Sequence, residues 1–239
     1  RRGAPENMEM NQIPADVQHC LDTLRKAGFA AYPVGGCVRD LLLGRVPGDY
    51  DVCTSALPEQ VTALFPHTAP TGVKHGTITV LGSGGAIEVT TFRREEGYSD
   101  GRRPDRVSFC AGLTEDLSRR DFTINAMALG PAGEVIDPFG GQADLAAGCI
   151  RCVGDAEQRF SEDALRMLRA VRFGAQLGFD IHPETLSALQ HQASWVCRVS
   201  RERIKAEMEK ILLSPRPERA ETLLRLGLLE HLSPVRTAP

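Results

Sequence analysis

The chain has 239 residues, of which 42% are hydrophobic and 25% charged, so it can bury a core in one large domain or two smaller ones. Its formal net charge of −3 argues against a surface coated in positive charge for unspecific nucleic-acid binding. No apolar run is long enough to cross a bilayer, and residues 1–11 lack the pattern of a secretory signal. These features predict a cytoplasmic protein with neither a membrane nor DNA as partner.

The first half of the chain alternates between helical and extended patterns. Apolar residues at helical spacing predict a helix over residues 15–27, with Gly28 as its C-cap candidate. A strand over residues 30–34 leads into Gly35 and Gly36, and a second helix follows over residues 38–43. Segments rich in Val, Ile, Thr and aromatic residues predict strands over residues 50–53, 77–81, 86–92 and 107–110.

From about Gln142 onward every clear pattern is helical. The periodicity covers residues 161–177, 183–191, 200–213 and 218–229. The run Asp137-Pro138-Phe139-Gly140-Gly141 precedes this part, and its proline and two glycines are typical of a turn or hinge. The sequence therefore predicts an α+β part followed by an all-helical part.

The seven cysteines are scattered and odd in number, which favours reduced thiols over a disulfide framework. Cys149 and Cys152 form a Cys-x-x-Cys, but no second pair follows at zinc-site spacing. We therefore expect small buried side chains there rather than a metal or redox site.

Two acidic residues, Asp49 and Asp51, flank Tyr50 in one of the predicted strands. Residues two apart on a strand point to the same face, so their carboxylates should lie close together. Such a pair repels unless a cation lies between them, and Mg²⁺ prefers oxygen ligands of this kind. An isolated Asp-x-Asp is more often a solvated loop, so the hypothesis depends on its surroundings.

The surroundings favour phosphate chemistry. Gly35 and Gly36 separate a strand from a helix, and Arg39 lies one turn into that helix. Glycines let backbone N–H groups approach a triphosphate, the helix N-terminus favours anions, and the arginine adds a charged fork. Glu88 is the only acid of its strand and could approach the same metals or activate the attacking hydroxyl, the alternative being an exposed strand residue.

Ordered motifs over about residues 32–229 resemble the class II CCA-adding tRNA nucleotidyltransferases and the related bacterial poly(A) polymerases. They comprise the glycine turn, the Asp-x-Asp strand, RRDFTINAMA at 119–128, DPFGG at 137–141 and EDALRMLRAVRF at 162–173. The resemblance implies a polymerase-beta-type nucleotidyltransferase head over residues 11–137, a helical neck for base recognition over 138–199 and a partial helical body over 200–239. It also implies Mg²⁺ as cofactor, CTP and ATP as substrates, and a tRNA 3′ end as acceptor.

Carried over residue by residue, the resemblance makes Asp49 and Asp51 metal ligands, with Glu88 as a weaker catalytic addition. Asp163 and Arg166 match the residues that read the base, and on one helix face an acceptor and a donor would select C and A over U and G. An opposite apolar stripe should leave the arginines of that helix free to line a cleft, although a solvated helix face is the alternative. The expected nucleotide contacts are Gly35, Gly36, Arg39, Arg120, Asp163, Arg166, Arg169 and Arg172.

We expect template-independent addition of C and/or A with release of pyrophosphate, by a two-metal mechanism that activates the RNA 3′-hydroxyl. An A-adding enzyme or a poly(A) polymerase is the alternative, because residues 93–104 resemble the flexible loop of family members that add A. A catalytically inactive RNA-binding module is a different class, against which Asp49, Asp51 and Arg39 argue. Full-length relatives continue beyond the position of Pro239, so we expect a truncated or unusually short member that holds tRNA weakly.

Overall fold

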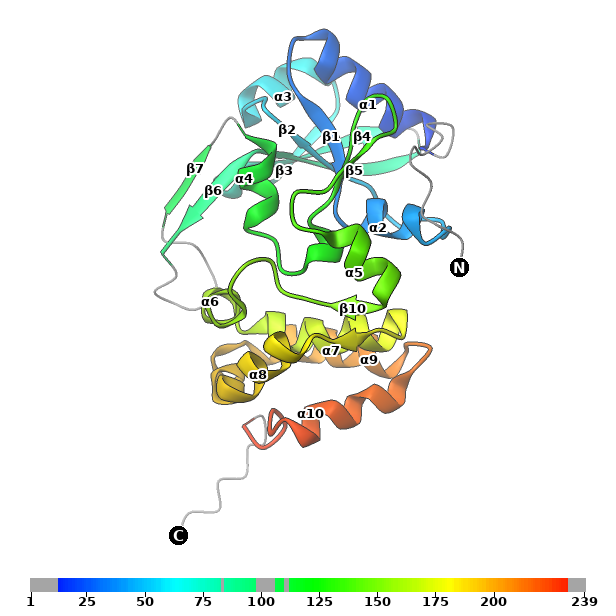
Figure 1. Ribbon diagram of the computed structural model, residues 1–239. Helices are drawn as coiled ribbons and strands as arrows, with labels where there is room; N and C mark the ends of the chain where they lie inside the picture. The colour runs from blue at the N-terminus through cyan, green and yellow to red at the C-terminus, as the bar shows by residue number, and fades with distance from the viewer. Residues whose placement is uncertain (1–12, 83, 98–105, 110–111, 232–239) are drawn as a thin grey trace. The chain divides into compact units, whose positions relative to one another are not determined.

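The computed structural model describes residues 13–82, 84–97, 106–109 and 112–231 (Figure 1). Its contacts divide the chain into two compact units: the first runs to Glu95 and resumes over Val107–Ala143, and the second combines Glu96–Arg106 with the chain from Asp144 onward. The three-part division at residues 137/138 and 199/200 stays a prediction. No helix in the described ranges is long and apolar enough to cross a membrane.

The first unit is built on a seven-stranded sheet with the order β3-β4-β5-β2-β1-β8-β9. Only β2 and β5 run parallel, and the other neighbouring pairs are antiparallel. The strands are β1 (Ala31–Val34), β2 (Asp51–Thr54), β3 (Thr68–Gly72), β4 (Thr77–Gly82), β5 (Gly85–Thr91), β8 (Ala128–Leu129) and β9 (Val135–Ile136).

Helices of the first unit pack on one face of this sheet, and the residues that alternate with this core along the strands, such as Asp51 and Glu88, point to the other face. Val17, Leu21 and Leu24 of α1 pack in one core cluster with Val61 of α3 and with the strand residue Val89. The helices are α1 (Ala15–Lys26), α2 (Gly36–Leu42), α3 (Pro58–Leu64) and α4 (Leu113–Ser118), with short 3-10 turns η2 (Val73–His75) and η3 (Thr123–Asn125), and α5 (Gly141–Ala147) crosses the boundary between the units.

A separate two-stranded sheet pairs β6 (Arg93–Glu96) with β7 (Arg106–Phe109). The flexible loop predicted over residues 93–104 falls partly on β6 and partly on residues 98–104, which lie outside the described residues. Cys110, the predicted last residue of a strand, also lies outside them.

The predicted strand over residues 50–53 starts one residue too early, and Asp49 lies before the strand that we expected to carry it. β2 begins at Asp51, which pairs with Val34, the last residue of β1. Gly35 then takes φ +79° and turns the chain into α2, so β1 offers no partner to the residues before Asp51. Alternation persists nevertheless, because Asp49 and Asp51 are exposed while Tyr50 is buried.

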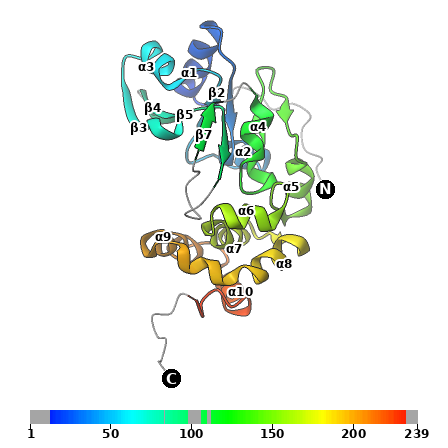
Figure 2. The ribbon, with the colours of Figure 1, turned by 90° about the vertical axis from the view of Figure 1, so that its left-hand side faces the viewer.

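The second unit gathers its helices around α7, as two views show (Figures 1 and 2). The elements are α6 (Ala156–Glu162), α7 (Leu165–Leu177), α8 (Pro183–His191), α9 (Arg201–Leu212), α10 (Glu221–Arg225), and the 3-10 turns η4 (Ala193–Arg198) and η5 (Pro217–Ala220). The expectation of helix alone is wrong, because β10 (Cys149–Ile150) pairs in parallel with β11 (Asp180–Ile181). The helix predicted over residues 218–229 is also shorter than expected, since α10 ends at Arg225.

The single helix predicted over residues 161–177 is wrong, because the chain breaks at Asp163. This residue has an extended backbone, with φ −147° and ψ 104°, and caps the end of α6. Its carboxylate accepts a hydrogen bond of 3.1 Å from the backbone N–H of Leu165, where α7 begins. Side-chain capping therefore competes with a continuous helix, as is usual for aspartate.

Candidate active site

The centre of the site in the first unit is a row of residues across the sheet. Asp51 of β2 lies directly opposite Glu88 of β5, and Glu88 in turn lies opposite Thr79 of β4. Residues paired in this way point to the same face of a sheet. Asp51 and Glu88 are exposed, whereas their neighbours Val52 and Val89 are buried in the helix-covered core. The register therefore brings both carboxylates to the same face of the sheet, opposite the core that contains Val52 and Val89.

The electrostatics of this row show an excess of negative charge. The pKa of Asp51 is raised above its ordinary value, first by partial loss of solvent and then by the charges of Asp49 and Glu88, while Arg120 acts in the opposite direction. Asp49 is thus close enough to act on Asp51 although it precedes the strand. Two further carboxylates so close to Asp51 favour a cation beside it.

The glycine turn, defined here as Gly35 and Gly36, lies at the end of β1 in the same row. The Gly35 N–H donates to the Met127 carbonyl at 3.1 Å, which fixes the turn against the next strand. A Cβ built on Gly35 would lie 2.7 Å from Nη1 of Arg120, and one built on Gly36 would lie 3.6 Å from Nη2 of Arg39. Two guanidinium groups therefore approach the turn.

The Arg39 guanidinium is held by two partners. Its Nε and Nη2 donate to the Asp40 carboxylate at 2.8 and 3.0 Å, and its Nη1 donates to Oδ1 of Asn125 at 2.8 Å. The Asn125 amide in turn donates to Oδ1 of Asp121 at 3.2 Å. Sequence reasoning missed Asn125 and Asp121 as positioning residues, although both lie in the motif at 119–128.

Sequence reasoning also missed Asp116, a fully buried carboxylate of α4. Nη2 of Arg119 lies 2.8 Å from Oδ1 of Asp116, and Nη2 of Arg120 lies 3.6 Å from Oδ2. The Arg120 Nε is buried and has no hydrogen-bond partner within the described part of the chain. Asp116 thus balances the charge of Arg120, whose Nη1 approaches the glycine turn.

Cys37, which directly follows the glycine turn in α2, has a buried thiol. Burial, followed by the charge of Asp51, raises its pKa to about 12. Its Sγ lies 3.2 Å from the Val34 carbonyl, to which it donates. Cys37 is therefore a protonated packing residue rather than a nucleophile.

A divalent metal fits the donor chemistry of the sheet row. Among the described residues, no group of three or more His, Cys, Asp or Glu side chains is arranged to hold a metal ion. Mg²⁺, however, is usually bound by one or two carboxylates, with water and substrate phosphates as its other ligands. The register pair of Asp51 and Glu88, with Asp49 close by, provides oxygen donors of that kind.

In the second unit, the predicted base-reading residues are each held by another side chain. The Asp163 carboxylate accepts from Nη1 and Nη2 of Arg203 in α9, at 3.2 and 2.7 Å. Nη1 of Arg166 donates to Oε2 of Glu162 at 2.6 Å and to the Arg159 carbonyl at 3.1 Å. The placement of Asp163 and Arg166 on one continuous helix is therefore wrong, and Arg203 and Glu162 are partners that the sequence did not indicate.

The two remaining arginines of α7 lie in different environments. Arg169 is half-buried, and its Cζ lies 5.4 Å from the ring centroid of Phe173. The expected open position of Arg172 is wrong, because this residue is buried and its Nε lies 2.7 Å from Oε2 of Glu207 in α9. Helical spacing alone could not show that Arg172 belongs to a buried ion pair rather than to a cleft.

Residues 31–151, just over half of the chain, match the family described as the poly A polymerase head domain. The chain belongs to the poly A polymerase head-domain family. Residues 178–238 match a second family, described as a probable RNA and SrmB-binding site of polymerase A. The resemblance found in the sequence motifs is thus confirmed.

Relatives of this head-domain family protein carry the name CCA-adding enzyme. The one from Geobacillus stearothermophilus is 52% identical over 213 residues, covering 89% of this chain and 53% of the relative. The one from Lactiplantibacillus plantarum is 50% identical over 213 residues, covering 88% of this chain and 52% of the relative. The chain therefore spans about half the length of the curated relatives that it matches.

Solved structures agree with the predicted head fold. The Bacillus stearothermophilus CCA-adding enzyme in complex with CTP has a TM-score of 0.84 at 47% identity, over 92% of this chain and 53% of that chain. The Thermotoga maritima CCA-adding enzyme complexed with tRNA_CCA has a TM-score of 0.79 at 28% identity, over 95% of this chain and 55% of that chain. The predicted α+β, polymerase-beta-type class is confirmed.

Proposed function

We propose that the chain adds C and/or A to a tRNA 3′ end without a template, from CTP and ATP and with release of pyrophosphate. The observation that carries the proposal is the approach of Arg39 and Arg120 to the glycine turn at the end of the row that holds Asp51 and Glu88. Cationic donors beside paired carboxylates suit phosphoryl transfer, whose catalysis is mainly positioning and charge stabilisation. Relatives named CCA-adding enzymes support the substrate class.

In this proposal Asp49 and Asp51 hold Mg²⁺, and Glu88 either joins them or accepts the proton of the attacking hydroxyl. Mg²⁺ supplies charge stabilisation to the attacking and leaving oxygens. Gly35 and Gly36 let the triphosphate approach the backbone N–H groups of the turn. Arg39 and Arg120 then orient the β- and γ-phosphates and bind the departing pyrophosphate.

Asp163 and Arg166 are proposed to read the base. An ionised carboxylate has about four acceptor sites, so the three hydrogen bonds that Asp163 accepts from Arg203 and Leu165 leave capacity for a base amine. Cytosine and adenine each place an amine beside a ring acceptor, whereas uracil and guanine present the reverse pattern. We propose Arg169 and Arg172 as weaker contributors, with Arg172 acting through the position of α7 because it is buried.

The regions proposed for these tasks are a head over residues 11–137, a neck over 138–199 and a partial body over 200–239. The second candidate function is addition of A alone, as in an A-adding enzyme or a poly(A) polymerase. It is favoured by residues 93–104, which resemble the loop of A-adding members. A catalytically inactive RNA-binding module is the alternative of a different class.

One assay separates these functions. The chain is incubated in Mg²⁺ with labelled tRNA that lacks CCA, with tRNA that ends in CC, and with each nucleoside triphosphate singly and in combination. CTP incorporation followed by ATP incorporation is expected, whereas ATP incorporation alone would identify the A-adding alternative. Asp51→Ala should abolish incorporation and leave the unfolding transition intact. Near-normal incorporation by that variant, or no incorporation by the unmodified chain, would overturn the proposal.

A further inference from the structure

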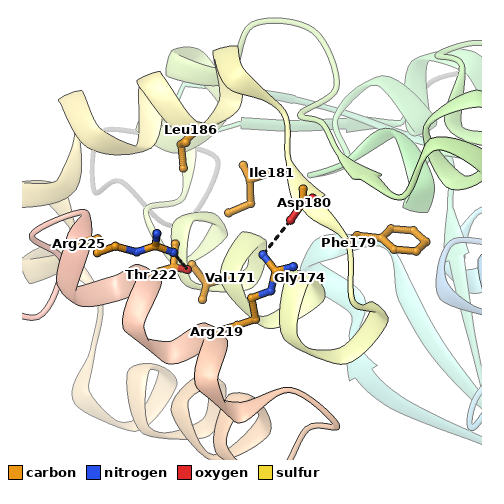
Figure 3. A pocket seen from close by; sticks show the side chains of 9 residues that line it. All are labelled: Val171, Gly174, Phe179, Asp180, Ile181, Leu186, Arg219, Thr222 and Arg225. Atoms are coloured by element: carbon orange, nitrogen blue, oxygen red, sulfur yellow. Dashed lines mark hydrogen bonds and ion pairs between the residues drawn. The ribbon is translucent and has the colours of Figure 1, made fainter.

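A small cavity in the second unit has no part in the site described above. It lies between α7, β11 and the segment formed by η5 and α10, and its volume is about 160 Å³ (Figure 3). Arg219 of η5 and Thr222 and Arg225 of α10 line one side, while Ile181 and Leu186 line the opposite side. The three polar residues follow each other at intervals of three, so they form one stripe along the η5–α10 segment.

The charges around the cavity favour an anion. Nη2 of Arg225 donates to Oγ1 of Thr222 at 3.3 Å, and no carboxylate among the described residues forms an ion pair with Arg225. Nη1 of Arg219 lies 2.8 Å from Oδ1 of Asp180, whose side chain is 84% exposed. A pair so exposed is weak, because water screens it. An arriving anion can therefore replace Asp180 at the Arg219 guanidinium.

The size of the cavity narrows the class of anion. Sites for drug-sized molecules usually enclose roughly 300–1,000 Å³, so about 160 Å³ is small for a whole nucleotide. It holds a single phosphate group with a few waters, since each water takes roughly 30 Å³ of liquid. Arginine is suited to this ligand, because its planar fork donates two parallel hydrogen bonds to phosphate oxygens.

We propose that Arg219, Thr222 and Arg225 bind one backbone phosphate of the RNA substrate. The inference rests on the proposed function for the identity of the RNA, and it adds a contact in the second unit, whereas the residues assigned to chemistry belong to the first unit. All three residues, together with Asp180, Ile181 and Leu186, fall within the region 178–238 that matches the second family. The apolar side of the cavity excludes water behind the phosphate and strengthens the charge-assisted hydrogen bonds.

The test measures the binding of labelled tRNA lacking CCA to the unmodified chain and to Arg225→Gln over a range of salt concentrations. Arg201→Gln is the matched control, because it removes the same charge from an exposed position on α9 outside the cavity lining. Arg225→Gln should weaken binding roughly three- to tenfold. It should also lower the slope of log affinity against log salt by about 0.7–0.9, the value for one lost phosphate contact. Thr222→Val, which keeps the helix and the shape of the side chain, should weaken binding less.

Each outcome decides the inference. Equal affinity and equal salt slope for Arg225→Gln and Arg201→Gln would overturn it, as would the absence of tRNA binding by the unmodified chain. If inorganic phosphate binds and depends on Arg225 while tRNA binding does not, the site serves free phosphate and the RNA assignment is overturned. If tRNA binds through Arg225 but no nucleotide is incorporated, the phosphate site is supported and the proposed enzymatic function fails separately.

Discussion

Arg203 of α9 holds the Asp163 carboxylate from a helix 40 residues away in the sequence, and Arg203→Ala removes that contact. The two hydrogen bonds measure 3.2 and 2.7 Å, and the paired side chains are 24% and 17% exposed. Exposed ion pairs are worth roughly 0.2–1 kcal/mol, whereas breaking a buried one costs roughly 3–5 kcal/mol. For this intermediate exposure we expect Arg203→Ala to remove about 2 kcal/mol. This energy appears either as a lower free energy of unfolding or, if it orients Asp163, as a change of about 30-fold in the preference for CTP over UTP.

The assay compares kcat/KM for CTP and for UTP, alongside urea unfolding. If Arg203 positions Asp163, Arg203→Ala should lower the preference for CTP over UTP by about 10- to 30-fold, because the carboxylate no longer faces the base amine in one orientation. Arg203→Lys keeps the charge but loses the bidentate fork. Its preference for CTP over UTP should therefore lie between those of the unmodified chain and Arg203→Ala. Arg201→Ala on the same helix is the control for a lost exposed arginine.

The two readouts separate positioning from a merely structural role. A structural role would lower kcat/KM for both nucleotides equally and leave their ratio unchanged. An unchanged ratio with reduced stability would therefore refute the positioning of Asp163 by Arg203. An unchanged ratio with unchanged stability would refute the energetic estimate as well.

Three further experiments test other parts of the structure. Gly35→Ala should cost about 1–3 kcal/mol in urea unfolding and reduce nucleotide incorporation, because φ is +79° and the new Cβ would lie 2.7 Å from a guanidinium; Gly36→Ala, whose Cβ would lie 3.6 Å from Nη2 of Arg39, should leave the free energy of unfolding nearly unchanged. Arg172→Met should lower the free energy of unfolding by about 3–5 kcal/mol because Glu207 stays buried, and adding Glu207→Leu should restore most of it; no recovery would contradict this account. Burial chiefly raises the pKa of Cys20 to about 12, so at pH 8 its thiol stays protonated, and mass spectrometry should show iodoacetamide labelling only after unfolding.

The sheet of the head could largely be predicted because its signals are local. Runs rich in Val, Ile, Thr and aromatic residues located β4 and β5 within one residue of their ends, and the glycine turn marked the entry to α2. Three strands of the sheet were missed: β8 and β9 have two residues, too few to show a period, and β3 contains a proline and a glycine, which are depleted in strands. The helical boundaries of α1 and α8 followed from apolar spacing in the same way.

The supporting contacts of the site could not be predicted, because each depends on residues far apart in the chain. Asn125 reaches Arg39 across 86 positions, and the sequence of either segment is compatible with a solvated side chain. Asp116 looks like an ordinary acid in the first turn of a short helix, yet it is fully buried beside two arginines. Which of these charged side chains are buried is determined only when the sheet has folded.

The error at Asp163 has the same origin and an added functional consequence. Apolar spacing continues through Leu165 and Leu168, so a periodicity argument runs across the break without detecting it. Because of the break, the Asp163 carboxylate is not on the surface of one continuous helix. It caps the start of α7 and accepts hydrogen bonds from Arg203. If the proposed base readout is correct, selectivity then depends on α9 as well as on α7, since the acceptor that meets the base is oriented by a residue of another helix. Changes in the packing of α9 against α7 should accordingly alter the choice of nucleotide before they alter the capacity to bind triphosphate, which we propose for the glycine turn of the head.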